Sequence, residues 1–385
     1  MGQNLEKLRE SVPDPARQQK AREYSKLQRR GFFIELSIGG ILLLVLLFTP
    51  ASTTLASFLV FPFPWSATLY LLILAAVYGV ITAPLGHYYN FVLPRRYGLS
   101  KQDLASWLWD KVKASGLQLC LGLCLVTVVY WLIGNIPGLW WLAVALIISL
   151  VSLILTWLTP TFLIPLFFKL KPLEEGGLKQ KLVDLARRAG FDINECLTMD
   201  LSSKATTANA MLSGWGRSRR IIFSDTLLEG YSWDEIGVTL AHELGHRLHN
   251  DIPKLIGIQA AAFLLVFYLT NLALRGGVAV FSLQGVSDIS GLPWLILVLA
   301  ILILVLQPAL NWYNRHIETA ADETALVLSD NPQAFVSLMT KLTDQNLNEA
   351  EPNKWVKLLF YDHPTYNERI KLAHNYGSRS DTKQA

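Results

Sequence analysis

The chain has 385 residues, of which 52% are hydrophobic and only 17% are charged, and its formal net charge is +4. Soluble globular domains carry about 25% charged residues, so this composition argues against a soluble enzyme. The net charge is too small to indicate a nucleic-acid partner. We therefore predict an integral membrane protein that contacts the lipid bilayer and binds no nucleic acid.

Six apolar runs are each long enough to cross, or nearly cross, the hydrocarbon core of a bilayer. They cover residues 32–48, 67–83, 117–133, 139–168, 255–274 and 292–310. No small-residue cleavage site follows the first run, so we expect a permanent span and not a cleaved signal peptide. The stretch 51–66, which alternates Phe and Pro, is expected to hold a re-entrant or interfacial piece.

Basic residues alternate strictly between the segments that these runs separate. The first, third, fifth and seventh segments carry 8, 5, 12 and 8 Lys and Arg residues, whereas the intervening ones carry 0, 0 and 1. The positive-inside rule then places both termini and the long segment 169–254 in the cytoplasm. The membrane is the bacterial inner membrane, or the endoplasmic reticulum membrane if the chain is eukaryotic.

The cytosolic segments have the pattern of a small α/β unit. A helix is predicted over 178–189, which ends at Gly190. Short strands are predicted over 196–201, 207–212 and 220–223, with a turn at 213–216. Ser232 and Glu235 form a capping box that begins the next helix. After the last span, 311–328 continues as helix, Pro332 precedes another helix, and the last dozen residues are expected to form a disordered tail.

The helix that begins at Ser232 contains the sequence His242-Glu243-Leu244-Gly245-His246. Histidines at i and i+4 lie on the same helix face, close enough for both imidazoles to bind one zinc ion. Glu243 is next to the first of these ligands and can accept a proton from metal-bound water. The pattern predicts a zinc-dependent hydrolase.

The third ligand distinguishes classes of zinc peptidase. A class with H-E-x-x-H-x-x-G-x-x-H is excluded, because His249 and Ile252 occupy the positions of its Gly and His. A glutamate from a second helix remains, and the downstream candidates are Glu318, Glu323, Glu349, Glu351 and Glu368. We choose Glu318, because it follows a span and is close to the small residues Ala320 and Ala321. Asp322, one turn later, can hydrogen-bond a ligand imidazole.

Several motifs together resemble the integral-membrane zinc metallopeptidases that include the type I CAAX prenyl protease, as a bacterial-type member. They are residues 89–93 and 97–101; Pro160, 164–169 and Pro172-Leu173; Asn209-Ala210, 220–223 and 225–228; Asn314-Arg315, Glu318 and Ala321-Asp322; and His363-Pro364 with Arg369. The resemblance implies a polytopic helical membrane protein with six to seven spans. It also implies a cytosolic zinc-metallopeptidase domain that carries a small β-sheet.

The resemblance also assigns roles to individual residues. It implies that Glu318 is the third zinc ligand, with Arg315 and Asp322 around the ligands. Asn209 and Ala210 would hold the substrate backbone by strand addition. His363 and Arg369 would stabilise the oxyanion. Without the resemblance, the residues alone predict no such roles. They indicate that Asn209 is a polar residue beside a turn and that His363 is a loop residue.

These inferences divide the chain into five segments. They are a cytoplasmic N-terminal segment (1–31), four spans (32–168), a catalytic segment with the edge strand and zinc helix (169–254), two spans (255–310) and a segment with the third ligand and C-terminal helices (311–385). We predict an endopeptidase with one Zn²⁺ per chain, a peptide or protein substrate and, by resemblance, a prenylated C-terminus. Alternatives are a membrane-protein quality-control protease and a non-catalytic scaffold or translocon-clearing factor.

Overall fold

The structure is a computed structural model that describes residues 12–213 and 220–384. Within these residues, six helical stretches are long and apolar enough to cross a membrane. They are α2 (Pro15–Phe48), Trp65–Arg96 with α4 (Trp65–His87), α6 (Leu104–Asn135), Trp140–Phe167 with α7 (Trp140–Leu158), α12 (Asp251–Val280) and Ile289–Ser329 with α13 (Leu292–Ser329). Each predicted apolar run lies in one of them, apart from the first and last residues of the fourth run, Leu139 and Phe168. The prediction of a polytopic helical membrane protein is confirmed.

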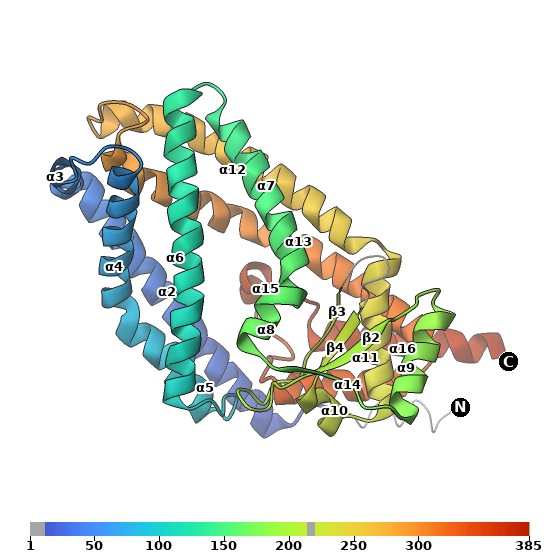
Figure 1. The fold of residues 1–385 in the computed structure, drawn as a ribbon. Helices are drawn as coiled ribbons and strands as arrows, with labels where there is room; N and C mark the ends of the chain where they lie inside the picture. Colours follow the sequence, from blue (N-terminus) through green and yellow to red (C-terminus); the bar gives the residue numbers. More distant parts are fainter. Residues whose placement is uncertain (1–11, 214–219, 385) are drawn as a thin grey trace.

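The six long helices contact one another in a closed order. Along the chain α2 contacts α4, α4 contacts α6, α6 contacts α7, α7 contacts α12, α12 contacts α13, and α13 contacts α2 again. Figure 1 shows that α12 leads away from the part that carries the sheet and that α13 returns to it. In the stretch 51–66 the chain forms the short helix α3 (Ala51–Phe58), and α4 begins at Trp65.

Buried side chains of the spans form one apolar cluster. Tyr70, Trp140 and Phe267 belong to it. Its polar groups are paired, because the Trp140 Nε1–H donates to Asn271 Oδ1 at 2.9 Å. Such a pair removes the cost of an unsatisfied polar group inside the membrane. The helix packing is therefore fixed by both apolar contact and buried hydrogen bonding.

The sheet lies at one end of these helices and has the strand order β1-β2-β4-β3. Its strands are β1 (Leu170–Pro172), β2 (Glu195–Met199), β3 (Ala210–Ser213) and β4 (Arg220–Ser224). β2 and β4 are parallel, whereas β1 and β3 are antiparallel to their neighbours. Three strands were predicted at these places, and β1 was not. β3 is an edge strand; most of the predicted turn after it, residues 214–216, lies outside the described residues.

Further helices complete the extramembrane part. They are α9 (Gly177–Arg188), α10 (Asp225–Gly230), α11 (Trp233–Leu248), α14 (Pro332–Gln345), α15 (Lys354–Phe360) and α16 (Tyr366–Gln384), with α5 (Leu93–Arg96) and α8 (Ile164–Phe167) at the ends of spans. Among them, α10 and α11 contact the sheet. The prediction that the last dozen residues form a disordered tail is wrong, because the helix α16 continues to Gln384. The predicted capping box of α11 is present.

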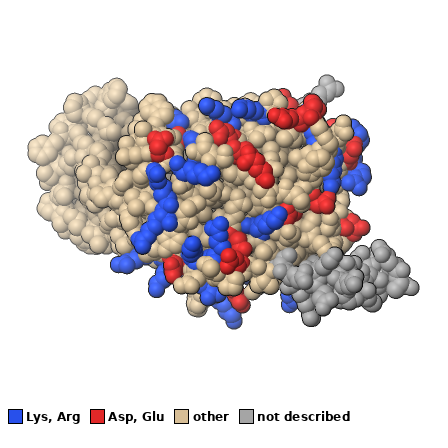
Figure 2. Space-filling view, turned by 90° about the horizontal axis from the view of Figure 1, so that it is seen from below, with Lys and Arg blue, Asp and Glu red and all other residues tan. Residues whose placement is uncertain are grey.

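Charged side chains are distributed unevenly. Figure 2 views the molecule from below Figure 1, and Lys, Arg, Asp and Glu cover much of the part with the sheet. None is visible in this view at the left end, where α3 lies in Figure 1. This division matches a chain with one end in lipid and the other in water.

The capping glutamate of α11 also joins this helix to α14. Glu235 is 2% exposed and accepts hydrogen bonds from Ser337 Oγ at 2.6 Å and Lys341 Nζ at 2.8 Å. Burial alone raises the pKa of Glu235, but the bonds to Lys341, Ser337 and the Ser232 amide outweigh it and lower the pKa. The ionised form therefore stabilises the folded state.

We expect Glu235→Gln to lower the free energy of unfolding by about 1–3 kcal/mol, because it removes charge-assisted hydrogen bonds to α14. Since the folded-state pKa is lowered, the advantage of the wild type is complete above the usual Glu pKa of 4.5 and is lost as the pH falls through the lowered value. Thermal unfolding in detergent at several pH values measures the difference. Equal stability of the two proteins at neutral pH would contradict this prediction.

Candidate active site

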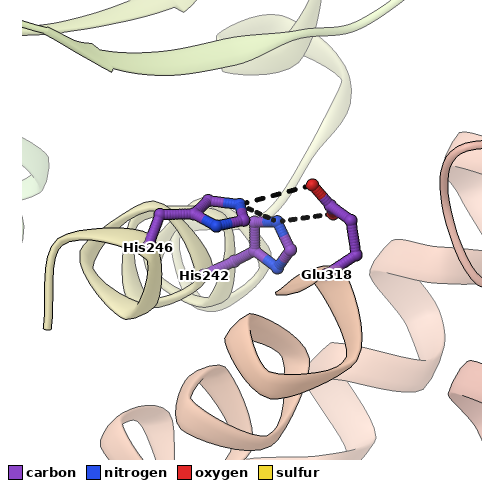
Figure 3. Close-up of side chains that lie close together, drawn as sticks. All are labelled: His242, His246 and Glu318. Carbon is purple, nitrogen blue, oxygen red and sulfur yellow. Dashed lines mark hydrogen bonds and ion pairs between the residues drawn. The ribbon is translucent and has the colours of Figure 1, made fainter. Parts of the chain in front are cut away.

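The site begins with a close contact between α11 and α13. A Cβ at Gly245 would lie 3.0 Å from Ala321 Cα and 3.1 Å from the Ala321 carbonyl oxygen, which is tighter than ordinary packing. Glycine in α11 and alanine in α13 therefore let the two backbones approach closely. As a result, the face of α11 that carries His242 and His246 lies against Glu318 of α13 (Figure 3).

Three side chains converge at this contact. His242 Nε2 lies 3.2 Å from His246 Nε2 and 3.3 Å from Glu318 Oε2, and His246 Nε2 lies 3.5 Å from Glu318 Oε1. One donor atom from each residue lies within 4.8 Å of the others. Figure 3 shows that the imidazoles come from one helix and the carboxylate from another.

Two buried carboxylates orient the imidazoles. His242 Nδ1 lies 2.9 Å from Asp322 Oδ1, and His246 Nδ1 lies 3.0 Å from Asp251 Oδ2. Because an ionised carboxylate only accepts hydrogen bonds, each Nδ1 carries the proton and donates it. When the ring is neutral, as in a metal ligand, each Nε2 presents a lone pair toward the other ring and toward Glu318. Such carboxylate–imidazole pairs are typical around metal-binding histidines.

The donor set fits a metal ion. Two nitrogen lone pairs and a carboxylate facing one another at these distances repel unless a cation lies between them. Burial alone lowers the pKa of His242, but hydrogen bonds to Asp322 and Glu318 outweigh it and raise the pKa to about 10. The surroundings therefore favour positive charge here. Two imidazoles and one glutamate form a recognised three-ligand zinc set.

Glu243 lies beside these residues and contacts the edge strand. Its Oε2 accepts a hydrogen bond from the Leu212 backbone N–H at 3.0 Å. Burial raises the pKa of the Glu243 carboxyl, although the two neighbouring histidines lower it in part. A carboxylate with a raised pKa is a stronger proton acceptor, as a general base requires.

His363 and Arg369 both reach Glu318. His363 Nε2 lies 3.5 Å from Glu318 Oε1, and His363 Nδ1 lies 2.8 Å from Asp362 Oδ1. The bond to Asp362 raises the pKa of His363. Arg369 Nη2 lies 3.3 Å from Glu318 Oε2, and its Nε lies 3.1 Å from Asp322 Oδ2. The structure thus brings both residues to the cluster.

Other residues named from the sequence lie elsewhere. Arg315 donates to the carbonyls of Lys357 and Tyr361, so it holds the segment before His363 and does not bond a ligand. The alternative third ligands Glu349 and Glu368 pair with Arg29 and Lys357. Neither belongs to the cluster.

The strand beside the cluster, β3, is the edge strand of the sheet. Ala210 begins β3, and Asn209 extends its pairing by one residue, because the Ser224 N–H donates to the Asn209 carbonyl at 2.9 Å. A cavity of about 480 Å³ lies along Asn209 and Ala210, and one of about 280 Å³ lies past Leu212. Glu243, Glu318 and His363 line both cavities, so the cluster lies where they meet.

Comparisons with known proteins agree with this geometry. Residues 172–376 match the family described as Peptidase family M48, and residues 4–169 match the description "CAAX prenyl protease N-terminal, five membrane helices". The chain belongs to peptidase family M48. The family matches and the site establish a membrane metalloprotease, and the alternative of a non-catalytic scaffold is not favoured.

Three relatives show how far the similarity extends. The uncharacterized metalloprotease YhfN of Bacillus subtilis is 29% identical over 92% of this chain and 84% of its own. The CAAX prenyl protease 1 homolog of rice is 30% identical over 77% of this chain and 71% of its own. The crystal structure of S. mikatae Ste24p covers 95% of this chain and 90% of its own at 25% identity, with a TM-score of 0.83. Both the membrane part and the peptidase part of this M48 chain therefore have relatives.

Two contacts of the M48 site were not predicted from the sequence. Asp251 reaches His246 only because Asn250 adopts the left-handed conformation, with φ of 53°, and turns the chain between α11 and α12. The Leu212 amide reaches Glu243 only through the packing of β3 on α11. A carboxylate just after a helix that carries two histidines is the one signal that could have indicated Asp251.

We expect His246→Ala to abolish stoichiometric metal binding, because two of three protein ligands do not form a closed set. His249→Ala is the matched control. His249 is also in this segment, but its Nε2 bonds Thr324 Oγ1 at 3.2 Å and lies outside the cluster. Elemental analysis of purified protein gives the metal content per chain. Full metal occupancy in His246→Ala would place the site elsewhere.

Proposed function

We propose that this M48 chain is a zinc endopeptidase in which His242, His246 and Glu318 hold one Zn²⁺. The observation that carries the proposal is the convergence of two imidazole Nε2 atoms and a carboxylate, beside Glu243 and the edge strand β3. When bound, zinc supplies a Lewis acid that makes water a nucleophile at neutral pH. Zinc is preferred over harder cations because two of the three donors are imidazoles.

Glu243 is the general base of the proposed reaction. Its Oε2 is held by the Leu212 amide, and burial keeps its pKa raised. It takes the proton of the attacking water on its carboxylate and later delivers it to the leaving amine. Because Glu243 follows His242 directly on α11, base and ligands are positioned by the same helix.

His363 and Arg369 are proposed to stabilise the oxyanion of the tetrahedral intermediate. The Arg369 guanidinium is a cation and the His363 ring is a hydrogen-bond donor, and both lie within 3.5 Å of Glu318. Asp362 orients His363 through its Nδ1, and the bond raises the pKa of the ring toward the protonated form. Preorganised donors of this kind stabilise charge that develops in the transition state.

The substrate is proposed to be a peptide segment that adds to the edge of β3 at Asn209 and Ala210. The name of the rice relative supports a prenylated C-terminus as one substrate class for this chain. A third cavity, of about 640 Å³, lies between α7 and β3 and has mostly apolar lining residues, among them Leu153, Trp157 and Ile256. It offers a place for an apolar group near the site.

The active site is proposed to face the cytoplasm. In Figure 1 the sheet, α5 and the C-terminal helices lie at one end of the spans. These parts belong to three of the four segments rich in Lys and Arg, which the positive-inside rule places in the cytoplasm. Segments 1–31, 169–254 and 311–385 then form the cytosolic part, and 32–168 and 255–310 form the membrane part. The membrane is the bacterial inner membrane or, in a eukaryote, the endoplasmic reticulum.

We expect Glu243→Gln to retain zinc and lose about 10²- to 10⁴-fold in kcat, because the base is removed and the ligands are kept. Glu323→Gln, an exposed glutamate of α13, is the control and is expected to keep full activity. The assay uses a farnesylated peptide with a C-terminal CAAX sequence and an unprenylated copy, with mass spectrometry of the products. Near-normal turnover by Glu243→Gln would refute the mechanism; equal cleavage of both peptides would refute only the prenyl preference.

The orientation is tested by cysteine labelling in intact cells. Native Cys120, Cys124 and Cys196 are replaced, and one cysteine is placed at Gly285 or at Gly176. Both glycines have space for a side chain; Gly285 lies in the connection between α12 and α13, and Gly176 directly precedes α9. In Figure 1 this connection and α9 lie at opposite ends of the spans. We expect an impermeant reagent to label position 285 from outside and to label position 176 only after lysis. The reverse result would place the active site outside the cytoplasm.

A further inference from the structure

The outer edge of β3 has a fixed alternation of backbone groups. The Ser224 N–H donates to the Asn209 carbonyl, so Asn209 and Ser224 form a hydrogen-bonded pair of the β3–β4 ladder. Such pairs recur at every second residue, so Met211 and Ser213 also turn their backbone groups toward β4. The N–H and C=O groups of Ala208, Ala210 and Leu212 therefore point to the outer edge, where a substrate strand would add.

Most of this edge is already bonded to side chains. The Thr206 carbonyl accepts from Gln345 Nε2 at 2.5 Å, and the Ala208 N–H donates to Asn346 Oδ1 at 3.1 Å. Farther along, the Leu212 N–H donates to Glu243. Within the described part of the chain, the N–H and C=O of Ala210 make no hydrogen bond on this side. The edge thus offers one open residue between the general base on one side and Asn346 on the other.

Asn346 is held firmly at this position. It follows the last residue of α14, and its N–H donates to the Leu342 carbonyl at 3.0 Å. The next residue, Leu347, is 2% exposed and anchors the loop that follows. In the same loop Glu349 pairs with Arg29 of α2 at 2.6 Å. Contacts from α14 and α2 therefore keep the Asn346 amide against the strand.

The polarity of the strand decides which end of the substrate meets Asn346. Antiparallel pairing is the more stable arrangement per residue, so a substrate runs opposite to β3. Its N-terminal part then lies toward Leu212, and its C-terminal part lies toward Ala208. Glu243 lies at the Leu212 end and Asn346 at the Ala208 end. The substrate segment that approaches Asn346 is therefore the one C-terminal to the scissile bond, which hydrolysis releases.

We propose that Asn346 is a specificity-determining residue that limits how many substrate residues lie C-terminal to the scissile bond. The proposal rests on the proposed endopeptidase function. A substrate residue paired with Ala210 belongs to the released segment, and two residues later the substrate reaches the amide that Asn346 already bonds. Since both strands advance by the same rise per residue, the released segment extends for about three to four residues before it must end or bend away.

The proposal is tested with peptides that differ only in the number of residues after the scissile bond, shorter and longer than this limit. We expect kcat/KM of the wild type to fall by about tenfold beyond the limit, because a longer segment loses strand hydrogen bonds or must displace Asn346. In Asn346→Ala the fall is expected to disappear. Asn348→Ala, which removes another asparagine of the same cavity, is expected to behave as the wild type.

Two further variants distinguish the amide from a general loss of structure. Asn346→Asp keeps an oxygen that can accept from the Ala208 N–H and is expected to keep the limit, whereas Asn346→Ser is too short to reach and is expected to lose it. Metal content per chain verifies that each variant retains the site. An unchanged length profile in both Asn346→Ala and Asn346→Ser, or a wild type insensitive to length, would overturn the proposal and leave the endopeptidase function intact. Failure of the wild type to cleave any peptide would remove the proposed function as well.

Discussion

The contact between α11 and α13 at Gly245 and Ala321 is the constraint on which the site depends. Glu318 precedes Ala321 by one turn of α13, and His242 and His246 lie on either side of Gly245 on α11. If the two helix backbones were farther apart, the carboxylate could not approach both imidazoles at 3.3 and 3.5 Å. Small residues at the crossing therefore set the geometry of the metal ligands.

The membrane part contributes directly to this contact. α11 is followed by α12, which leads away from the sheet, and α13 returns to it as a single helix to Ser329 (Figure 1). The third ligand is thus carried on the extension of a span. Because α13 also contacts α2, the spans fix its position, and the site is built at the boundary between the membrane part and the extramembrane part.

Features that depend only on neighbouring residues or on the spacing of residues along the chain could be predicted from the sequence. The six spans follow from the length of apolar runs, because bilayer thickness and helix rise fix the number of residues. His242, Glu243 and His246 follow from helix periodicity, and Glu318 from its place after a span among small residues. The capping box at Ser232 and Glu235 is also a local pattern.

Features that depend on tertiary contacts could not be predicted in this way. β1 has three residues and includes Pro172, so it lacks a strand pattern and forms only by pairing with β2. The resemblance placed Arg315 around the metal ligands, and no sequence pattern indicated that its guanidinium bonds the carbonyl of Tyr361 in the structure. The contact of Asn346 with Ala208 joins residues far apart in the chain, and no periodicity indicates it.

Zinc affinity of two glycine variants tests the central claim most directly. Gly245→Ala places a Cβ 3.0 Å from Ala321 Cα, whereas Gly237→Ala, on the same helix, meets only Leu185 Cδ2 at 4.0 Å. Both substitutions raise helix propensity equally, so they differ mainly in the effect on the contact. We predict that Gly245→Ala weakens zinc binding by about 10- to 100-fold, as displacement of ligand-orienting groups does, while Gly237→Ala binds like the wild type. Wild-type zinc affinity in Gly245→Ala would contradict the account.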